Sequence, residues 1–121
     1  MDIRKLQKIV VSALEDIKGK DIEVINTTKL TSMFDRLVIA TGDSNRQVKA
    51  LAGNVQEKVK EAGGEVLSTE GEDGGEWVLV DLGDIVVHVM QPTVRQYYNL
   101  EELWQATPAQ RRKAAEQAPS E

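Results

Sequence analysis

Two aspartates and a histidine near the C-terminal half of this 121-residue chain are of types that could do chemistry. Asp81 and Asp84 are the best candidates for a pair of metal-binding carboxylates, and His88, the single histidine, is the best candidate for a general base. Side chains on one face of a strand have even spacing, so residues three apart do not share a face. Asp84 instead suits a role in organising a turn. With no Ser-His-Asp pattern in the sequence, His88 is more typical of packing or hydrogen bonding. We therefore predict no enzyme activity, no metal site and no cofactor.

The segment from Thr41 to Ser44 precedes a predicted helix and could hold an anion at the helix N-terminus. It lacks the glycine spacing and the lysine of a phosphate-binding loop. Asp43 would also repel a phosphate. The segment therefore favours helix capping over anion binding.

The stretch from Trp77 to Met90 predicts a β-hairpin, because two apolar runs flank Gly83 and Asp84. Glycine at the first position of a two-residue loop is typical of a type II′ turn. Alternation then places only aliphatic side chains on one face: Val78, Val80, Leu82, Ile85, Val87 and Val89. The other face carries Trp77, Leu79, Asp81, Val86, His88 and Met90.

These two faces predict different roles. The aliphatic face is a core face, whereas the mixed face suits contact with a partner, because exposed apolar patches mark interaction sites and tryptophan is a frequent interface anchor. In the alternative interpretation, Trp77 is buried beneath the segment Tyr97-Tyr98. A second copy of the chain could also cover the mixed face.

Composition limits the class of protein. The chain has 40% hydrophobic and 29% charged residues, enough for one domain with a single modest core. It has no cysteine, which excludes disulfides, cysteine-bound zinc and a thiol nucleophile. No apolar run approaches the roughly 20 residues of a membrane span, and the N-terminus does not read as a signal peptide. We expect a cytoplasmic protein.

The net charge of −5 argues against nucleic acid as a direct partner, because nucleic-acid affinity depends on basic residues that neutralise phosphates. The acidic segment 70–76 suits a basic protein surface. It also fits a simple solvated turn, as most charge runs do.

Hydrophobic periodicity predicts two amphipathic helices. The first covers residues 3–17, with Asp2 as its N-cap and a stop at Gly19. The second follows Ser44, with Gln47 completing a capping-box pattern, and ends at residues 63–64. Strands are predicted over 22–25, 35–41 and 65–68 and in the hairpin, followed by a short helix over 99–104 that docks through Leu100, Leu103 and Trp104.

The predicted order is α-β-β-α-β-β-β, an α/β fold with a mixed sheet of about five strands and two main helices on one face. We assign residues 1–105 to a single domain. Residues 106–121 have no apolar face to bury and are predicted to be a mobile tail.

Several segments together resemble the ribosomal silencing factor (RsfS, or Iojap) family over nearly the whole chain to Trp104. They are Asp35-Arg-Leu-Val-Ile-Ala-Thr-Gly42, Ser44-Asn-Arg-Gln47, Glu70-Gly71, the stretch from Trp77 to His88, and Arg95-Gln-Tyr-Tyr-Asn-Leu-Glu-Glu-Leu-Trp104. The family pattern usually has Asp-Tyr-Phe where this chain has Asp35-Arg-Leu37.

This resemblance implies a small nucleotidyltransferase-like fold that binds the universal large-subunit protein number fourteen on the intersubunit face of the ribosome. Bound there, the factor would block joining of the small subunit and reduce translation when nutrients are short. Organelle relatives act in ribosome assembly, which is an alternative role. An enzyme with this fold is another alternative, but nucleotidyl transfer needs clustered carboxylates that hold magnesium, and the chain offers only Asp81 and Asp84.

The resemblance and the hairpin together predict a partner-binding surface. Its centre is predicted to be apolar and aromatic, its acidic residues to match basic ones, and two tyrosines to extend it. The predicted residues are Trp77, Leu79, His88 and Met90 at the centre, Asp81 and Glu70 as the acidic pair, and Tyr97 and Tyr98 at the edge. The same surface could form a homodimer.

Overall fold

The computed structural model describes residues 1–105, so the predicted tail at 106–121 lies outside the described residues. The elements, in chain order, are α1 (Ile3–Asp16), β1 (Lys20–Asn26), β2 (Arg36–Thr41), α2 (Asn45–Glu61), β3 (Ser68–Glu70), β4 (Trp77–Asp81), β5 (Ile85–Met90), α3 (Pro92–Tyr98) and α4 (Leu100–Gln105). Asp2 caps α1 as predicted, since its side chain accepts a hydrogen bond from the backbone N–H of Arg4.

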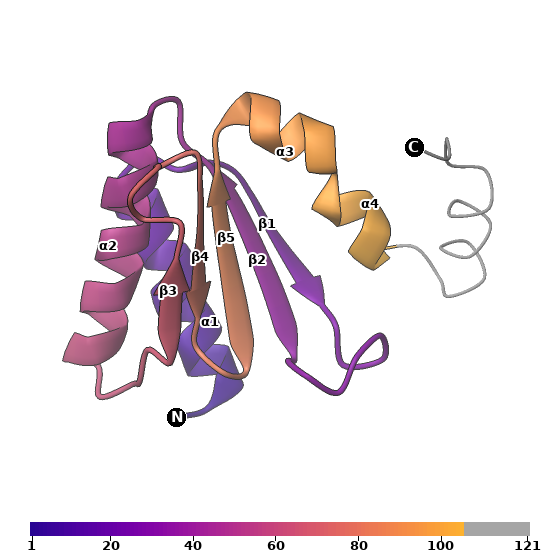
Figure 1. Ribbon diagram of the computed structural model, residues 1–121. Helices are drawn as coiled ribbons and strands as arrows, with labels where there is room; N and C mark the ends of the chain where they lie inside the picture. The colour runs from indigo at the N-terminus through magenta and orange to yellow at the C-terminus, as the bar shows by residue number, and fades with distance from the viewer. Residues whose placement is uncertain (106–121) are drawn as a thin grey trace.

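The strands form one mixed sheet in the order β1-β2-β5-β4-β3. Strands β2 and β5 are parallel neighbours, and the other pairs are antiparallel. Figure 1 shows α1 and α2 together on one side of the sheet, with α3 and α4 on the other side. The predicted α/β fold with a mixed five-stranded sheet and two main helices on one face is confirmed.

The hairpin forms with the predicted register. Val78 lies opposite Val89 and Val80 opposite Val87, and the N–H of Leu82 donates to the carbonyl of Ile85 at 2.9 Å. Gly83 has φ +89°, as the first loop position of a type II′ turn requires.

One turn prediction is wrong. The side chain that organises the loop is that of Asp81, whose Oδ1 accepts from the N–H of Gly83 at 2.8 Å. Asp84 contributes its backbone carbonyl, which accepts from the N–H groups of Asp35 and Arg36. Asp84 therefore ties the hairpin to the start of β2 and does not act through its carboxylate.

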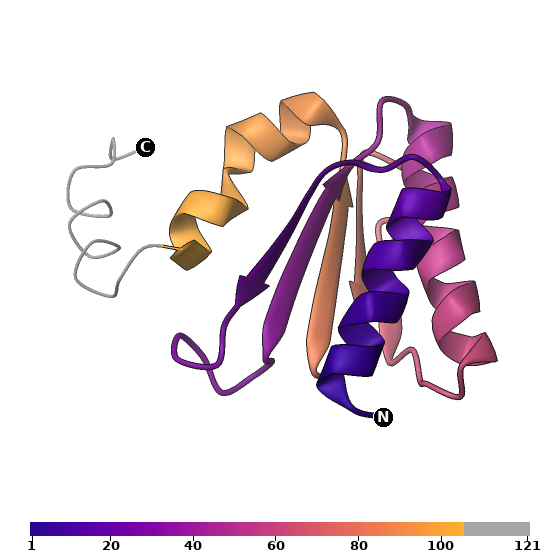
Figure 2. The same ribbon diagram turned by 180° about the vertical axis from the view of Figure 1, so that it is seen from behind.

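The main core lies between the aliphatic face of the hairpin and the two long helices. Buried residues recur every three or four positions along α1 and α2, and they pack on the buried valines of β2, β4 and β5. The fully buried members from the helices include Val10, Leu14, Val48, Leu51, Val55 and Val59. Figure 2 shows these helices packed side by side, seen from behind.

Strand β3 begins three residues later than predicted, at Ser68 instead of at residue 65. Ser68 pairs with Asp81, the last residue of β4, because the tight turn follows directly. Because β4 ends at Asp81, the segment 65–67 has no strand beside it to pair with. The N–H of Leu67 still donates to the carbonyl of Asp81. The side chain of Leu67 is left 57% exposed.

The C-terminal prediction of one short helix is incomplete, because the described chain has two, joined at Asn99 in the left-handed conformation. Helix α3 buries no residue, so its sequence has no apolar stripe to detect. Leu100 and Trp104 of α4 pack on the sheet as predicted, whereas Leu103 is 49% exposed and does not dock.

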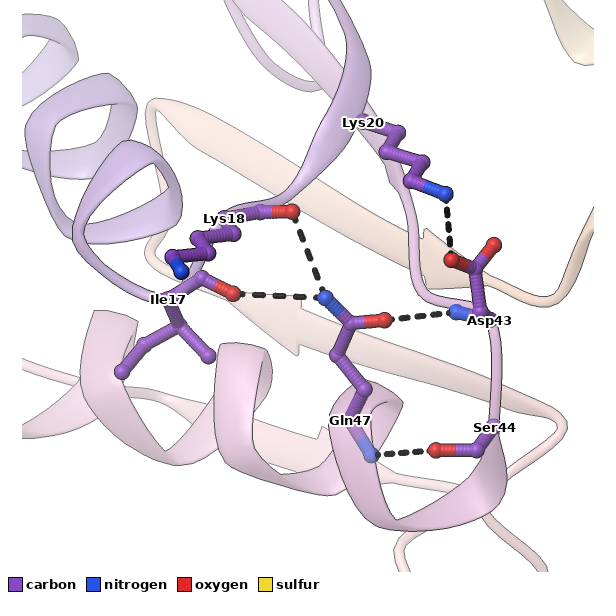
Figure 3. A network of polar contacts seen from close by, with 6 residues as sticks. All are labelled: Ile17, Lys18, Lys20, Asp43, Ser44 and Gln47. Atoms are coloured by element: carbon purple, nitrogen blue, oxygen red, sulfur yellow. Dashed lines mark hydrogen bonds and ion pairs between the residues drawn. The ribbon is translucent and has the colours of Figure 1, made fainter.

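The side chain of Gln47 connects the C-terminal end of α1 to the N-terminal end of α2 (Figure 3). The Ser44 hydroxyl accepts from the N–H of Gln47 at 3.1 Å, which confirms the predicted cap. The Gln47 carbonyl oxygen accepts from the N–H of Asp43 at 2.7 Å, one residue before the position that a capping box uses. Its amide nitrogen donates to the carbonyls of Ile17 and Lys18 at 3.3 and 3.2 Å.

We predict that Gln47→Ala lowers the free energy of unfolding by about 1 to 2 kcal/mol, because it leaves the carbonyls at the end of α1 and the N–H of Asp43 without these partners. Urea denaturation measures the loss. Glu57→Ala, an exposed change in the same helix, is the control and should stay within about 0.5 kcal/mol of the wild type. Equal stability of the two variants would show that the Gln47 contacts contribute nothing.

Candidate protein-binding face

The side of the sheet away from α1 and α2 is only half covered. Helices α3 and α4 pack on its β1, β2 and β5 part, where Ile25, Leu37, Ile39 and Met90 are buried. Strands β3 and β4 present the remaining part, and direct cross-strand pairing places Glu70 beside Leu79 and Ser68 beside Asp81. We call this part the open face. It consists of Ser68, Glu70, Trp77, Leu79 and Asp81.

A groove of about 450 Å³ separates the open face from α4. Leu79, Asp81 and His88 line it from the sheet, and Leu100 and Trp104 line it from α4. Two exposed apolar side chains also line it: Met33 at 82% and Leu67 at 57% exposed. The groove is therefore mainly apolar, with a carboxylate and an imidazole among its lining groups.

Trp77 and His88 are held together across the hairpin. The indole Nε1–H of Trp77 donates to Nδ1 of His88 at 2.9 Å. The Trp77 ring also lies against Tyr98, with ring centroids 4.7 Å apart. Because Nδ1 accepts this bond, the neutral imidazole carries its proton on Nε2.

Burial lowers the pKa of His88 from 6.5 to about 4. The imidazole is therefore neutral near pH 7, with one nitrogen engaged by Trp77. An efficient general base has a pKa near the working pH, so His88 does not fit that role.

The acidic segment lies beside Trp77. Its residues Glu70, Glu72, Asp73 and Glu76 are exposed. A side chain at Gly71 would place its Cβ 2.1 Å from the carbonyl oxygen of Trp77, so only glycine allows this approach. The close packing holds the start of the acidic segment against the backbone of Trp77. This role of Gly71 was not predicted from the sequence, although Glu70-Gly71 was one of the segments that carry the family resemblance.

The structure brings most of the predicted site residues together. Glu70, Trp77, Leu79 and Asp81 share the open face, and His88 lies at its border. Tyr98 covers part of Trp77, which is therefore half-buried. Trp77 is neither fully available to a partner nor fully buried beneath the tyrosines, so each of the two hypotheses is met only in part. The Tyr97 ring is exposed and lies against the Tyr98 ring, with ring centroids 5.0 Å apart.

Met90 is the exception among these residues. It was predicted to belong to the contact centre, but its side chain is fully buried in the cluster beneath α3 and α4. It pairs with Trp77 across the hairpin and offers no area to a partner. The alternation of the strand was correctly predicted, but the covering helices could not be placed from it.

No sequence pattern marked Met33 and Leu67 as residues of the groove. Met33 belongs to a connection that reads as polar, and Leu67 to a segment predicted as a strand. They line the groove because the fold brings both loops to it.

Within residues 1–105, no group of three or more histidine and carboxylate side chains is arranged to hold a metal ion. No helix in that part of the chain combines the length and apolar character needed to cross a membrane.

A family profile described as "Ribosomal silencing factor during starvation" matches residues 1–121. The chain belongs to this family of ribosomal silencing factors. It is 62% identical over 104 residues to the ribosomal silencing factor RsfS of Chromobacterium violaceum, covering 86% of this chain and 85% of that protein.

Two further comparisons extend this result. A crystal structure of a Chromobacterium violaceum protein matches with a TM-score of 0.86 and 60% identity, covering 88% of this chain and 89% of the other. A mouse protein named "Mitochondrial assembly of ribosomal large subunit protein 1" is 32% identical over 99 residues, which cover 79% of this chain and 43% of the mouse protein.

We predict that His88 makes the stability of this silencing factor depend on pH. Its unfolded-state pKa of about 6.5 lies above the folded-state value of about 4, so the unfolded chain binds more protons between these limits. The free energy of unfolding therefore falls as the pH falls through this window, by about 3 kcal/mol in total. Urea denaturation at several pH values measures it.

His88→Asn removes the titrating group and serves as the control. The difference in unfolding free energy between the wild type and this variant should shrink toward low pH. Two profiles that stay parallel from pH 7 to pH 4 would show that His88 is not buried as a neutral group.

Proposed function

We propose that this silencing factor binds the large ribosomal subunit through its open face and thereby prevents the small subunit from joining. The observation that carries the proposal is the groove beside the open face, where Leu79 lies next to Glu70 of β3 and shares the lining with Asp81. The exposed side chains of Met33 and Leu67 line the same groove. Apolar residues that the fold leaves uncovered favour a protein partner.

Charge supports a basic partner. The chain has a net charge of −5, and the carboxylates of Glu70 and Asp81 lie on the open face itself. Complementary charge accelerates association and selects the partner. A basic ribosomal protein satisfies this requirement, and the family resemblance points to the universal large-subunit protein number fourteen.

The mechanism is steric. A domain bound on the intersubunit side occupies a surface that the small subunit needs, and no chemical step is required. This agrees with the roles of Asp81, which caps a turn, and His88, which holds Trp77. Reduced subunit joining would lower translation when nutrients are short, and we place this action in the cytoplasm.

A role in assembly of the large subunit is the second candidate, favoured by the name of the mouse relative. The two roles differ in what the bound factor does to mature subunits. In the silencing role, adding the protein to separated mature subunits reduces the fraction that joins. In a role confined to assembly, joining is unchanged.

The open face could also pair with a second copy of the chain. Dimerisation would then compete with ribosome binding, because both use the same residues. Sedimentation of the free protein over a range of concentrations separates the two, since a single monomer species at high concentration excludes such a dimer.

We predict that Glu70→Lys weakens binding to isolated large subunits about tenfold, because it reverses an exposed charge on the open face. Co-sedimentation with the subunits measures the affinity. Glu57→Lys makes the same change of charge at an exposed position of α2, on the covered side of the sheet, and should bind like the wild type. If both variants lose the same affinity, net charge and not the open face determines binding.

A further inference from the structure

His88 has a hydrogen-bond donor with no partner among the described residues. Its side chain lines the groove beside the open face and is only 9% exposed. Its Nδ1 accepts from Trp77, which leaves the proton on Nε2. Buried polar groups are normally hydrogen-bonded, and an unmade bond at such a group is costly. A donor left free inside a groove therefore points to an acceptor that arrives with a ligand.

We propose that the Nε2–H of His88 determines specificity in this groove by donating to a carbonyl oxygen of the bound protein partner. This inference rests on the proposed function, and it names what the partner must present. The occupant is a peptide segment that inserts an apolar side chain between Leu79 and Trp104 and places a carbonyl beside His88.

The lining groups select this chemistry. An apolar side chain matches Leu79, Leu100 and Trp104, which line opposite sides of the groove. A carboxylate is also an acceptor, but Asp81 lines the same groove and would repel it. An ammonium or guanidinium group has no lone pair to accept the bond. A neutral carbonyl satisfies the donor, and a basic residue next to it would satisfy Asp81.

The bond to Trp77 prepares His88 for this role. Because the indole N–H occupies Nδ1, the neutral imidazole is held in the tautomer in which Nε2 is the donor. Trp77 is itself on the open face, so one hydrogen bond orients both residues. The Nε2–H of His88 is therefore oriented to donate before the partner binds.

Two substitutions separate the nitrogens of His88. The amide of His88→Asn reaches the position of Nδ1 and can still accept from Trp77, but it places nothing at Nε2. The amide of His88→Gln reaches the position of Nε2 and restores a donor there while losing the bond to Trp77. We expect His88→Asn to weaken binding of the full chain to isolated large subunits about tenfold, and His88→Gln to bind within about threefold of the wild type.

Nuclear magnetic resonance of the free variants shows whether each change does what it is designed to do. The indole N–H resonance of Trp77 should stay at its wild-type position in His88→Asn and move in His88→Gln. In the wild type, the imidazole nitrogens should report the Nε2–H tautomer. A proton on Nδ1 in the free wild-type protein would overturn the inference.

The binding results distinguish failure of this inference from failure of the proposed function. If the wild type binds large subunits, and either His88→Asn binds equally well or His88→Gln binds no better than His88→Asn, the donor role is wrong and the proposed function stands. If neither the wild type nor Glu57→Lys sediments with large subunits, the proposed function is wrong, and this inference is overturned with it.

Discussion

The structure depends on the alternation of side chains along one β-hairpin. Successive residues of a strand point to opposite faces, and β4 and β5 place only aliphatic side chains toward α1 and α2. The same alternation forces Trp77, Leu79 and Asp81 to the other side of the sheet. Helices α3 and α4 cover the β1, β2 and β5 part of that side and reach Trp77 through Tyr98, so the surface left open lies around Leu79, Asp81 and β3. A single pairing register thus determines both the core and the candidate interface.

The polar groups on that surface are organised by local hydrogen bonds. Asp81 accepts from the turn that ends its own strand, and His88 accepts from Trp77 on the neighbouring strand. Burial lowers the pKa of His88 to about 4, so it stays neutral beside the groove. A neutral donor beside apolar walls and an acidic rim favours a basic protein surface with an accessible backbone over a small charged substrate.

Features coded by neighbouring residues were predictable from the sequence. The hairpin register follows from Gly83 and the flanking alternation, and both long helices follow from their apolar stripes and from the caps at Asp2 and Ser44. Features that depend on distant segments were not. The start of β3 is determined by where β4 ends, and α3 has no buried residue that could mark it.

The candidate site divides in the same way. Membership of the second sheet face was predictable for Leu79 and His88, because alternation alone decides it. Exposure was not, since Met90 lies on the same face but beneath α3 and α4. Met33 and Leu67 belong to loops that the tertiary fold brings to the same groove, and no local pattern encodes that.

Amide hydrogen exchange of the full chain, alone and bound to isolated large subunits, tests the binding face most directly. We expect slower exchange on binding in residues 67–82, which include β3, the acidic segment and β4, with α2 unchanged. Protection of α2 or the outer side of α1, with residues 67–82 unchanged, would contradict it.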